Sequence, residues 1–124
     1  MDTIGDAEIV VIGGGGIGCG VLHSLCQAGK TDVLLLEKNE ALASETTSQA
    51  AGLVGQVRTS IERVELAMWS VKTFSELQED ERAPAGWRQV GSLRIAMNEQ
   101  RVKEFSRMAD VAGQAGLEVE FIEP

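Results

Sequence analysis

The chain has 124 residues, of which 11 are Lys or Arg and 19 are Asp or Glu, so its formal net charge is −8. This acidic balance argues against nucleic acid or an anionic membrane as a partner, because both bind clustered basic side chains. No apolar run approaches the roughly 20 residues that a transmembrane helix needs. Hydrophobic residues make up 44% of the chain, which is typical of a soluble globular protein.

The first third of the chain has the pattern of a β-α-β unit. Residues Ile9–Ile12 form a short β-branched run, which predicts a strand buried on both faces. Apolar residues then recur at three- and four-residue spacing from Ile17 to Cys26, and Gly29 follows, which predicts an amphipathic helix that a glycine ends. Val33–Leu36 is a second such strand. The two strands are therefore expected to be parallel, with a right-handed crossover.

Six of the 14 glycines lie between positions 13 and 20, at the junction of the first strand and the helix. Gly13, Gly15 and Gly18 fit the pattern G-x-G-x-x-G, whose glycines permit a tight turn, close approach of a pyrophosphate and close helix packing, respectively. Glu37 follows the second strand about 20 residues later, where a carboxylate accepts hydrogen bonds from a ribose. The pattern predicts a dinucleotide site without a 2′-phosphate, and a structural glycine turn is the alternative.

The remainder of the chain predicts a loop, two helices and two further strands. Residues 39–55 lack periodicity and are rich in small and hydroxyl-bearing residues, which indicates an ordered loop with one helical turn. A helix opens near Thr59, where Thr59 and Glu62 fit a capping box, and ends before the turn at Pro84. The later elements are a strand over Val90–Met97, a helix over Glu99–Ala115 that Gly116 ends, and a strand over Glu118–Ile122. We expect a domain boundary at Pro84–Trp87, separating residues 1–83 from 84–124.

Several separated blocks of sequence carry a family resemblance: "VVIGGGGIG", "VLLLEKNEAL", "ASETTSQAAGL", "AAGLVGQVR" and "GWRQVGSLRIAMN". In this order they resemble the start of the sarcosine and dimethylglycine dehydrogenases, which belong to the glycine-oxidase and D-amino-acid-oxidase group of FAD enzymes. The resemblance runs from Ile9 to Pro124. It implies an α/β fold, with a Rossmann-like FAD-binding βαβ unit in residues 1–83 and the beginning of a mixed-sheet substrate-binding domain in residues 84–124. The fold is expected to be incomplete as a 124-residue chain.

The resemblance implies FAD as the cofactor and suggests which residues bind it. The glycine loop and the ribose end would contribute Gly13, Gly15, Gly16, Ile17, Gly18, Glu37 and Lys38, and the flavin-side loop would contribute Thr46, Thr47, Ser48, Gln49, Gly52 and Leu53. Arg58 either reaches the flavin or a substrate carboxylate by bidentate pairing, or forms an ion pair at a helix edge. Many relatives carry a histidine at the position of Gln49 and attach FAD through it. Since glutamine cannot form that bond, we predict that FAD is held non-covalently.

The function that the resemblance implies is oxidation of a secondary or tertiary amine, such as the N-methyl amino acids sarcosine or dimethylglycine, by hydride transfer to the flavin. Two alternatives stay open: a non-catalytic relative of the pyruvate dehydrogenase phosphatase regulatory subunit, and a fragment of an NAD-dependent dehydrogenase. The expected partners are the amine and the missing remainder of the polypeptide or a complementary subunit, so the isolated chain is expected to be inactive. The acidic N-terminus predicts a cytoplasmic location, or the mitochondrial matrix if a transit peptide has been removed.

A few further residues are assigned structural positions. His23 is the only histidine and is expected on the helix surface, and Trp69 and Trp87 are expected to pack. Cys19 and Cys26 are seven residues apart on one helix, which is too far for a disulfide. No Cys/His cluster has the spacing of metal ligands.

Overall fold

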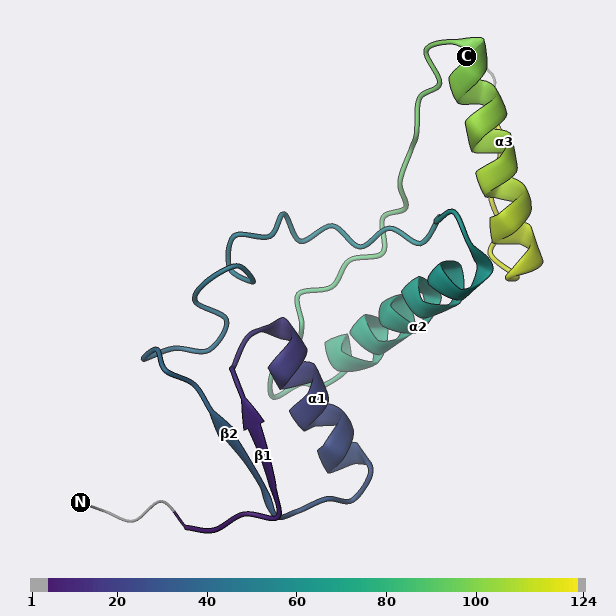
Figure 1. Cartoon of the computed structure of the whole chain (residues 1–124). Helices are drawn as coiled ribbons and strands as arrows, with labels where there is room; N and C mark the ends of the chain where they lie inside the picture. The colour runs from purple at the N-terminus through teal and green to yellow at the C-terminus, as the bar shows by residue number, and fades with distance from the viewer. Residues whose placement is uncertain (1–4, 123–124) are drawn as a thin grey trace. The chain divides into compact units, whose positions relative to one another are not determined.

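The computed structural model describes residues 5–122 (Figure 1). Its elements, in chain order, are β1 (Ile9–Ile12), α1 (Gly16–Gln27), β2 (Val33–Leu36), α2 (Ile61–Gln78) and α3 (Glu99–Gln114). The chain divides into two compact units, Met1–Leu53 and Val54–Pro124. Among the described residues, no helix is long and apolar enough to cross a membrane. The domain boundary expected between residues 83 and 84 stays a prediction. Residues 1–4 and 123–124, at the outer ends of the two expected domains, lie outside the described residues.

The first unit contains the expected β-α-β arrangement. Strands β1 and β2 pair in parallel with Ile9 opposite Val33 and Ile12 opposite Leu36, and the Gly13 N–H continues the pairing by donating to the Leu36 carbonyl at 2.8 Å. Helix α1 packs against both strands, which lie side by side in Figure 1. Both strands and the helix therefore form where the sequence predicts them.

The expectation that both faces of these strands are buried is wrong for the described residues. Burial alternates along β1: Ile9 and Val11 are half-buried, whereas Val10 is exposed and Ile12 is 85% exposed. Successive side chains of a strand point to opposite faces, and α1 is the only helix that packs on this pair of strands in the described chain. Helix α1 therefore covers one face of β1, and the side chains on its other face, Val10 and Ile12, are exposed.

The second unit is built on the contact between α2 and α3. Its buried apolar side chains are Val64, Ala67 and Val71 from α2 and Ala112 from α3. The expected packing role of Trp87 is confirmed, because its ring stacks on that of Phe74 with centroids 5.6 Å apart, whereas Trp69 is largely exposed. The N-cap residue of α3 is Asn98, whose side chain accepts a hydrogen bond from the Arg101 N–H. The helix ends before Gly116, where φ is +81°.

The start of α2 differs from the predicted capping box. The N-cap residue is Ser60 rather than Thr59, and its side chain caps no backbone N–H group of the helix. Because the helix begins at Ile61, Glu62 is its second residue, whereas a capping box places the Glu at the third. The Thr59–Glu62 box is therefore wrong by one position.

The two strands predicted in the last third of the chain do not form. Residues 90–97 and 118–122 carry no strand structure, although their apolar and polar side chains alternate. The apolar side chains of the first segment are exposed, with Val90 at 86% and Leu93 at 83%. A strand is stabilised by hydrogen bonds to a neighbouring strand, and within the described residues neither segment has one. Alternation of apolar and polar side chains is therefore not sufficient by itself to predict a strand.

Candidate dinucleotide-binding site

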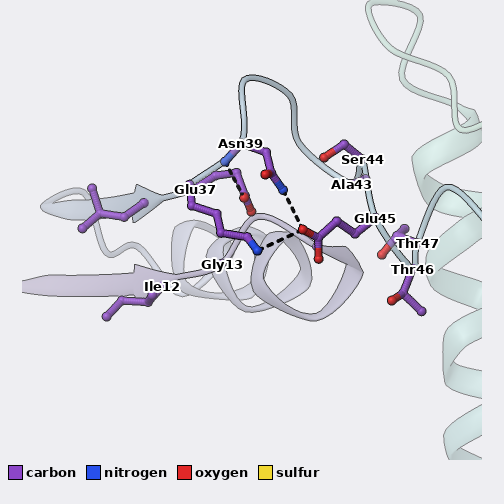
Figure 2. Close-up of a pocket in the computed structure, with 12 residues that line it drawn as sticks. Ile12, Gly13, Glu37, Asn39, Ala43, Ser44, Glu45, Thr46 and Thr47 are labelled. Carbon is purple, nitrogen blue, oxygen red and sulfur yellow. Dashed lines mark hydrogen bonds and ion pairs between the residues drawn. The ribbon is translucent and has the colours of Figure 1, made fainter.

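A cavity of about 360 Å³ lies in the first unit, at the carboxyl ends of β1 and β2. Ligands of α/β proteins usually bind beyond this end of the strands. The cavity is drawn in Figure 2, and its lining comes from the ends of both strands, the glycine loop and the loop after β2: Ile12, Gly13, Gly15, Leu36, Glu37, Lys38, Asn39, Ala43, Ser44, Glu45, Thr46 and Thr47. Segments separated by about 30 residues in the chain thus meet at one place because β1 and β2 are paired neighbours.

The glycine loop has the geometry that its pattern predicts. Gly13 has φ of +102°, a conformation that L side chains rarely adopt, so it permits the turn from β1 into α1. A Cβ atom at Gly18 would overlap the carbonyl group of Gly13, which confirms that Gly18 allows close packing of α1. Gly15 differs, because a Cβ there would lie 3.5 Å from the Thr47 Oγ1, an ordinary contact. Packing within the protein therefore does not require a glycine here, and the missing side chain leaves space on the cavity side.

Glu37 is fixed at the end of β2 by two backbone hydrogen bonds. Its Oε2 accepts from the Gly14 N–H at 2.7 Å, and its Oε1 accepts from the Asn39 N–H at 2.9 Å. These bonds, that of Asn39 first, hold the pKa of Glu37 below its ordinary value, so the side chain stays ionised near neutral pH. Each carboxylate oxygen has a further lone pair, which leaves Glu37 able to accept hydrogen bonds from a ribose.

The loop after β2 returns to the N-terminus of α1 through Thr47. Its Oγ1 accepts a hydrogen bond from the Gly16 N–H at 3.0 Å, and the Ala43 N–H donates to the Gly14 carbonyl at 2.9 Å. Residues 45–50 form a short turn with i to i+3 hydrogen bonds, including Ser48 N–H to the Glu45 carbonyl. The expected helical turn within this loop is therefore present, and it places Thr46 and Thr47 at the cavity.

Two cavity residues that the sequence did not single out, Asn39 and Glu45, connect the ends of this loop. The Oε1 of Glu45 accepts from Asn39 Nδ2 at 3.1 Å and lies 3.0 Å from the ammonium group of Lys38 (Figure 2). The Asn39 amide and then Lys38 lower the pKa of Glu45, and Glu45 raises the pKa of Lys38. A pairing six or seven residues apart in a non-periodic loop has no sequence signature, since it depends on the path of the loop.

The other predicted site residues lie outside the cavity lining. Gly16, Ile17 and Gly18 occupy the first turn of α1, with Ile17 largely exposed. The Ser48 hydroxyl donates to the Ser44 and Glu45 carbonyls, and Gln49, Gly52 and Leu53 are exposed. Arg58 belongs to the second unit, where its Nη1 donates to the Val57 carbonyl, and it forms no ion pair with a described residue. Cofactor contacts by these residues stay predictions.

The residues around the cavity fit the adenosine and pyrophosphate portion of a dinucleotide. The first backbone N–H groups of a helix have no acceptor within the helix, and they favour an anion. At α1, Thr47 accepts from Gly16, while the N–H groups of Gly15 and Ile17 have no protein acceptor among the described residues. The ionised Glu37 supplies the ribose acceptor on the same cavity. Residues 5–122 contain no group of His, Cys, Asp or Glu side chains able to hold a metal ion.

The histidine lies on the surface of α1, as the sequence predicts, and the two cysteines lie on the same helix. Cys19 and Cys26 are both free, and the Cys19 thiol donates a hydrogen bond to the Gly14 carbonyl at 3.3 Å. His23 is exposed on α1. None of the three lines the cavity, and Cys26 is exposed rather than packed.

Comparisons with known proteins find similar sequences over most of the chain. A family model described as FAD dependent oxidoreductase matches residues 8–124. The chain is 40% identical over 119 residues to human sarcosine dehydrogenase, covering 95% of this chain and 13% of that protein. It is 37% identical over 118 residues to human dimethylglycine dehydrogenase, covering 95% and 14%, respectively. The chain therefore spans only a small part of the length of the curated relatives that it matches.

A solved structure is also similar. The L-proline dehydrogenase of P. horikoshii superposes with a TM-score of 0.81 at 27% sequence identity, covering 90% of this chain and 29% of that one. This similarity confirms the predicted α/β fold class with a Rossmann-like nucleotide-binding portion.

Proposed function

The chain belongs to the family of FAD-dependent oxidoreductases, and we propose that its cavity binds the adenosine and pyrophosphate portion of FAD. The enzyme of which it is part oxidises a secondary or tertiary amine. The substrate is an N-methyl amino acid such as sarcosine or dimethylglycine. Bound FAD supplies a two-electron oxidant that accepts a hydride from the carbon beside the amine nitrogen. The family assignment favours FAD over the NAD alternative.

The observation that carries this proposal is the position of Glu37. Its carboxylate is held by the Gly14 and Asn39 N–H groups at the end of β2 and lines the same cavity as Gly13 and Gly15. A ribose acceptor and a pyrophosphate-binding turn on one cavity match the two polar parts of a dinucleotide.

We assign the binding tasks to the residues of this chain as follows. The turn at Gly13 and Gly15 gives the pyrophosphate access to the backbone, and Gly16, Ile17 and Gly18 present the N-terminus of α1 to it. Glu37 accepts from the ribose, with Lys38 beside it. The loop residues Thr46, Thr47, Ser48, Gln49, Gly52 and Leu53 extend from the N-terminus of α1, where Thr47 lies, toward the flavin, and Arg58 contacts the flavin or the substrate carboxylate. The attachment is non-covalent, because Gln49 has no nucleophilic ring nitrogen.

The names of the similar proteins support the substrate class. Sarcosine, dimethylglycine and proline all carry a substituted amine nitrogen next to a carbon that bears a hydrogen. We propose that the amine and the rest of the polypeptide, or a complementary subunit, are the partners of this chain. The cytoplasm is its proposed location. The alternative is the mitochondrial matrix, which is supported by the description of both human relatives as mitochondrial.

The test is anaerobic reduction of the flavin in the holoprotein that contains this chain. Sarcosine or dimethylglycine should bleach the visible flavin absorbance, whereas glycine, which has no N-methyl group, should not. Bound FAD that no amine bleaches, together with a stable phosphatase complex, would instead support the regulatory alternative. Absence of any bound FAD would contradict the proposal that the cavity binds this cofactor.

A further inference from the structure

The loop after β2 reaches the N-terminus of α1, and both of its ends are held close to the glycine loop. One end begins at Glu37, which bonds to the Gly14 N–H. The other is the turn over residues 45–50, from which Thr47 Oγ1 accepts the Gly16 N–H. Between them, Ala43 has φ of +56°, which is unfavourable for a residue with a side chain. The path of this loop is thus set by the contacts at its two ends together with the Ala43 N–H, which donates to the Gly14 carbonyl.

Three side chains connect the two ends, and we call Lys38, Asn39 and Glu45 the Glu45 cluster. The Asn39 backbone N–H donates to Glu37, and its side-chain amide donates to Glu45. Lys38 pairs with the same Oε1 of Glu45. Figure 2 shows the Glu45 side chain pointing from the loop toward Asn39. The cluster therefore ties the first residue of the 45–50 turn to the end of β2.

Fixing Glu45 also fixes Thr47, because both belong to one hydrogen-bonded turn. The Glu45 carbonyl accepts from the Ser48 N–H at 3.1 Å and from the Ser48 hydroxyl at 2.7 Å. Thr47 lies inside this turn, so its hydroxyl moves with it. An exposed ion pair contributes little to global stability, and the Lys38 and Glu45 side chains are 76% and 63% exposed. A local effect on loop position is accordingly the main consequence of the cluster.

We propose that Glu45 is a positioning residue for the cofactor: through Asn39 and Lys38 it holds the 45–50 turn so that Thr47 stays at the N-terminus of α1, where the pyrophosphate binds. Glu45 acts through Thr47 and does not itself contact FAD. The inference rests on the proposed function, because it assumes that the cavity takes FAD. It adds a residue to the site that the glycine motif and the family resemblance did not mark.

The first measurement is the affinity of the purified protein for FAD, followed by quenching of flavin fluorescence. Glu45→Ala should weaken binding about fivefold, since it removes two hydrogen-bonded contacts from an exposed loop. Glu45→Gln keeps an oxygen acceptor and should recover most of the affinity. The matched control is Glu40→Ala, which removes the same charge from the same loop at a residue outside the cavity lining.

The charge control separates positioning from electrostatics. Removing a carboxylate near a pyrophosphate should by itself tighten binding, and Glu40→Ala should show no loss. Weaker binding in Glu45→Ala alone therefore supports positioning. Equal affinities in the two variants would overturn the proposal. The unfolding midpoint of Glu45→Ala should stay near that of the wild type, which excludes general loss of structure as the cause.

The second measurement is amide hydrogen exchange at Gly16, which requires no bound cofactor. Thr47→Val removes the hydroxyl that accepts from the Gly16 N–H, and Glu45→Ala displaces it. Each variant should therefore accelerate exchange at Gly16. The double variant should exchange no faster than Thr47→Val alone, since effects along one pathway are not additive. Additive effects would overturn the proposal. If the wild type bound no FAD at all, the proposed function would fail, while this exchange cycle would still decide whether Glu45 positions Thr47.

Discussion

At the residue scale, Gly18 has the closest approach to another backbone of any described glycine. A Cβ atom added there would overlap the carbonyl group of Gly13, whereas one added at Gly20, on the same helix, would meet nothing within 4 Å. We therefore predict opposite effects of the same substitution. Gly18→Ala should destabilise the fold by about 1–3 kcal/mol through overpacking, and Gly20→Ala should stabilise it by up to about 1 kcal/mol through helix propensity.

Urea unfolding of both variants, monitored by circular dichroism, measures these differences. A Gly18→Ala variant as stable as Gly20→Ala would show that α1 does not pack against the strand turn as closely as the structure indicates.

The Glu37 carboxylate gives the fold a defined dependence on pH. Backbone N–H groups of Asn39 and Gly14 lower its pKa in the folded state from the ordinary value of 4.5. A lowered folded-state pKa contributes stability that is fully present above the unfolded-state value and is lost as the pH falls through the folded-state value. As the pH is lowered below 4.5, we expect the unfolding midpoint of the wild type to decrease more steeply than that of Glu37→Gln. Parallel curves would contradict this assignment, and Glu40→Gln serves as the control.

Gln49 determines the expected mode of cofactor attachment. An amide cannot form the covalent bond that a histidine forms, so acid precipitation of the holoprotein should leave the flavin in the supernatant. A yellow pellet after washing would show a covalent bond to another residue. A Gln49→His variant provides a useful comparison, because only this variant has an imidazole at the position where the relatives carry theirs.

The sequence predicted the residues whose role depends on local backbone, and missed those whose role depends on the loop path. Gly13 and Gly18 were identified by spacing, because a strand followed by a helix constrains the turn between them in a known way. Asn39 and Glu45 were not identified, because their contacts form across an irregular loop. Gly14 was also missed as a packing residue, although it is buried beneath Leu42 and donates to Glu37.

At the element scale, the two long helices differ in how they begin. The Asn98 side chain accepts from the Arg101 N–H at the start of α3, whereas the Ser60 side chain caps no backbone N–H of α2. Asn98→Ala should therefore cost about 1 kcal/mol of stability, and Ser60→Ala should cost less. Thermal unfolding of the two variants measures the difference, and equal losses would contradict the observed capping.

Helices were predicted more reliably than strands in this chain, for a physical reason. A helix satisfies its hydrogen bonds within one segment, so local signals such as Gly116 after α3 and the turn at Pro84 after α2 are enough to indicate the two helices. A strand depends on a neighbour, which Ile9–Ile12 has in Val33–Leu36. Residues 90–97 and 118–122 have the strand pattern without a paired neighbour in the described chain, and they stay irregular.

At the scale of the whole molecule, the buried core of the described chain is small. The fully covered apolar side chains all come from the α2–α3 unit, while Ile12, Leu93 and Met97 are more than three-quarters exposed. The chain also covers only 13–14% of the human relatives. The cavity that we propose binds the nucleotide lies within the first unit.

The central claim is that the cavity at the ends of β1 and β2 binds FAD through Glu37 and the glycine loop. The direct test is a titration of the purified apoprotein that contains this chain with FAD, with ADP as competitor. We predict saturable binding of one FAD per chain, displaced by ADP, weakened about tenfold in Glu37→Ala and unchanged or tighter in Glu40→Ala. Binding that ADP does not displace, or that Glu37→Ala leaves as strong as in the wild type, would contradict the account.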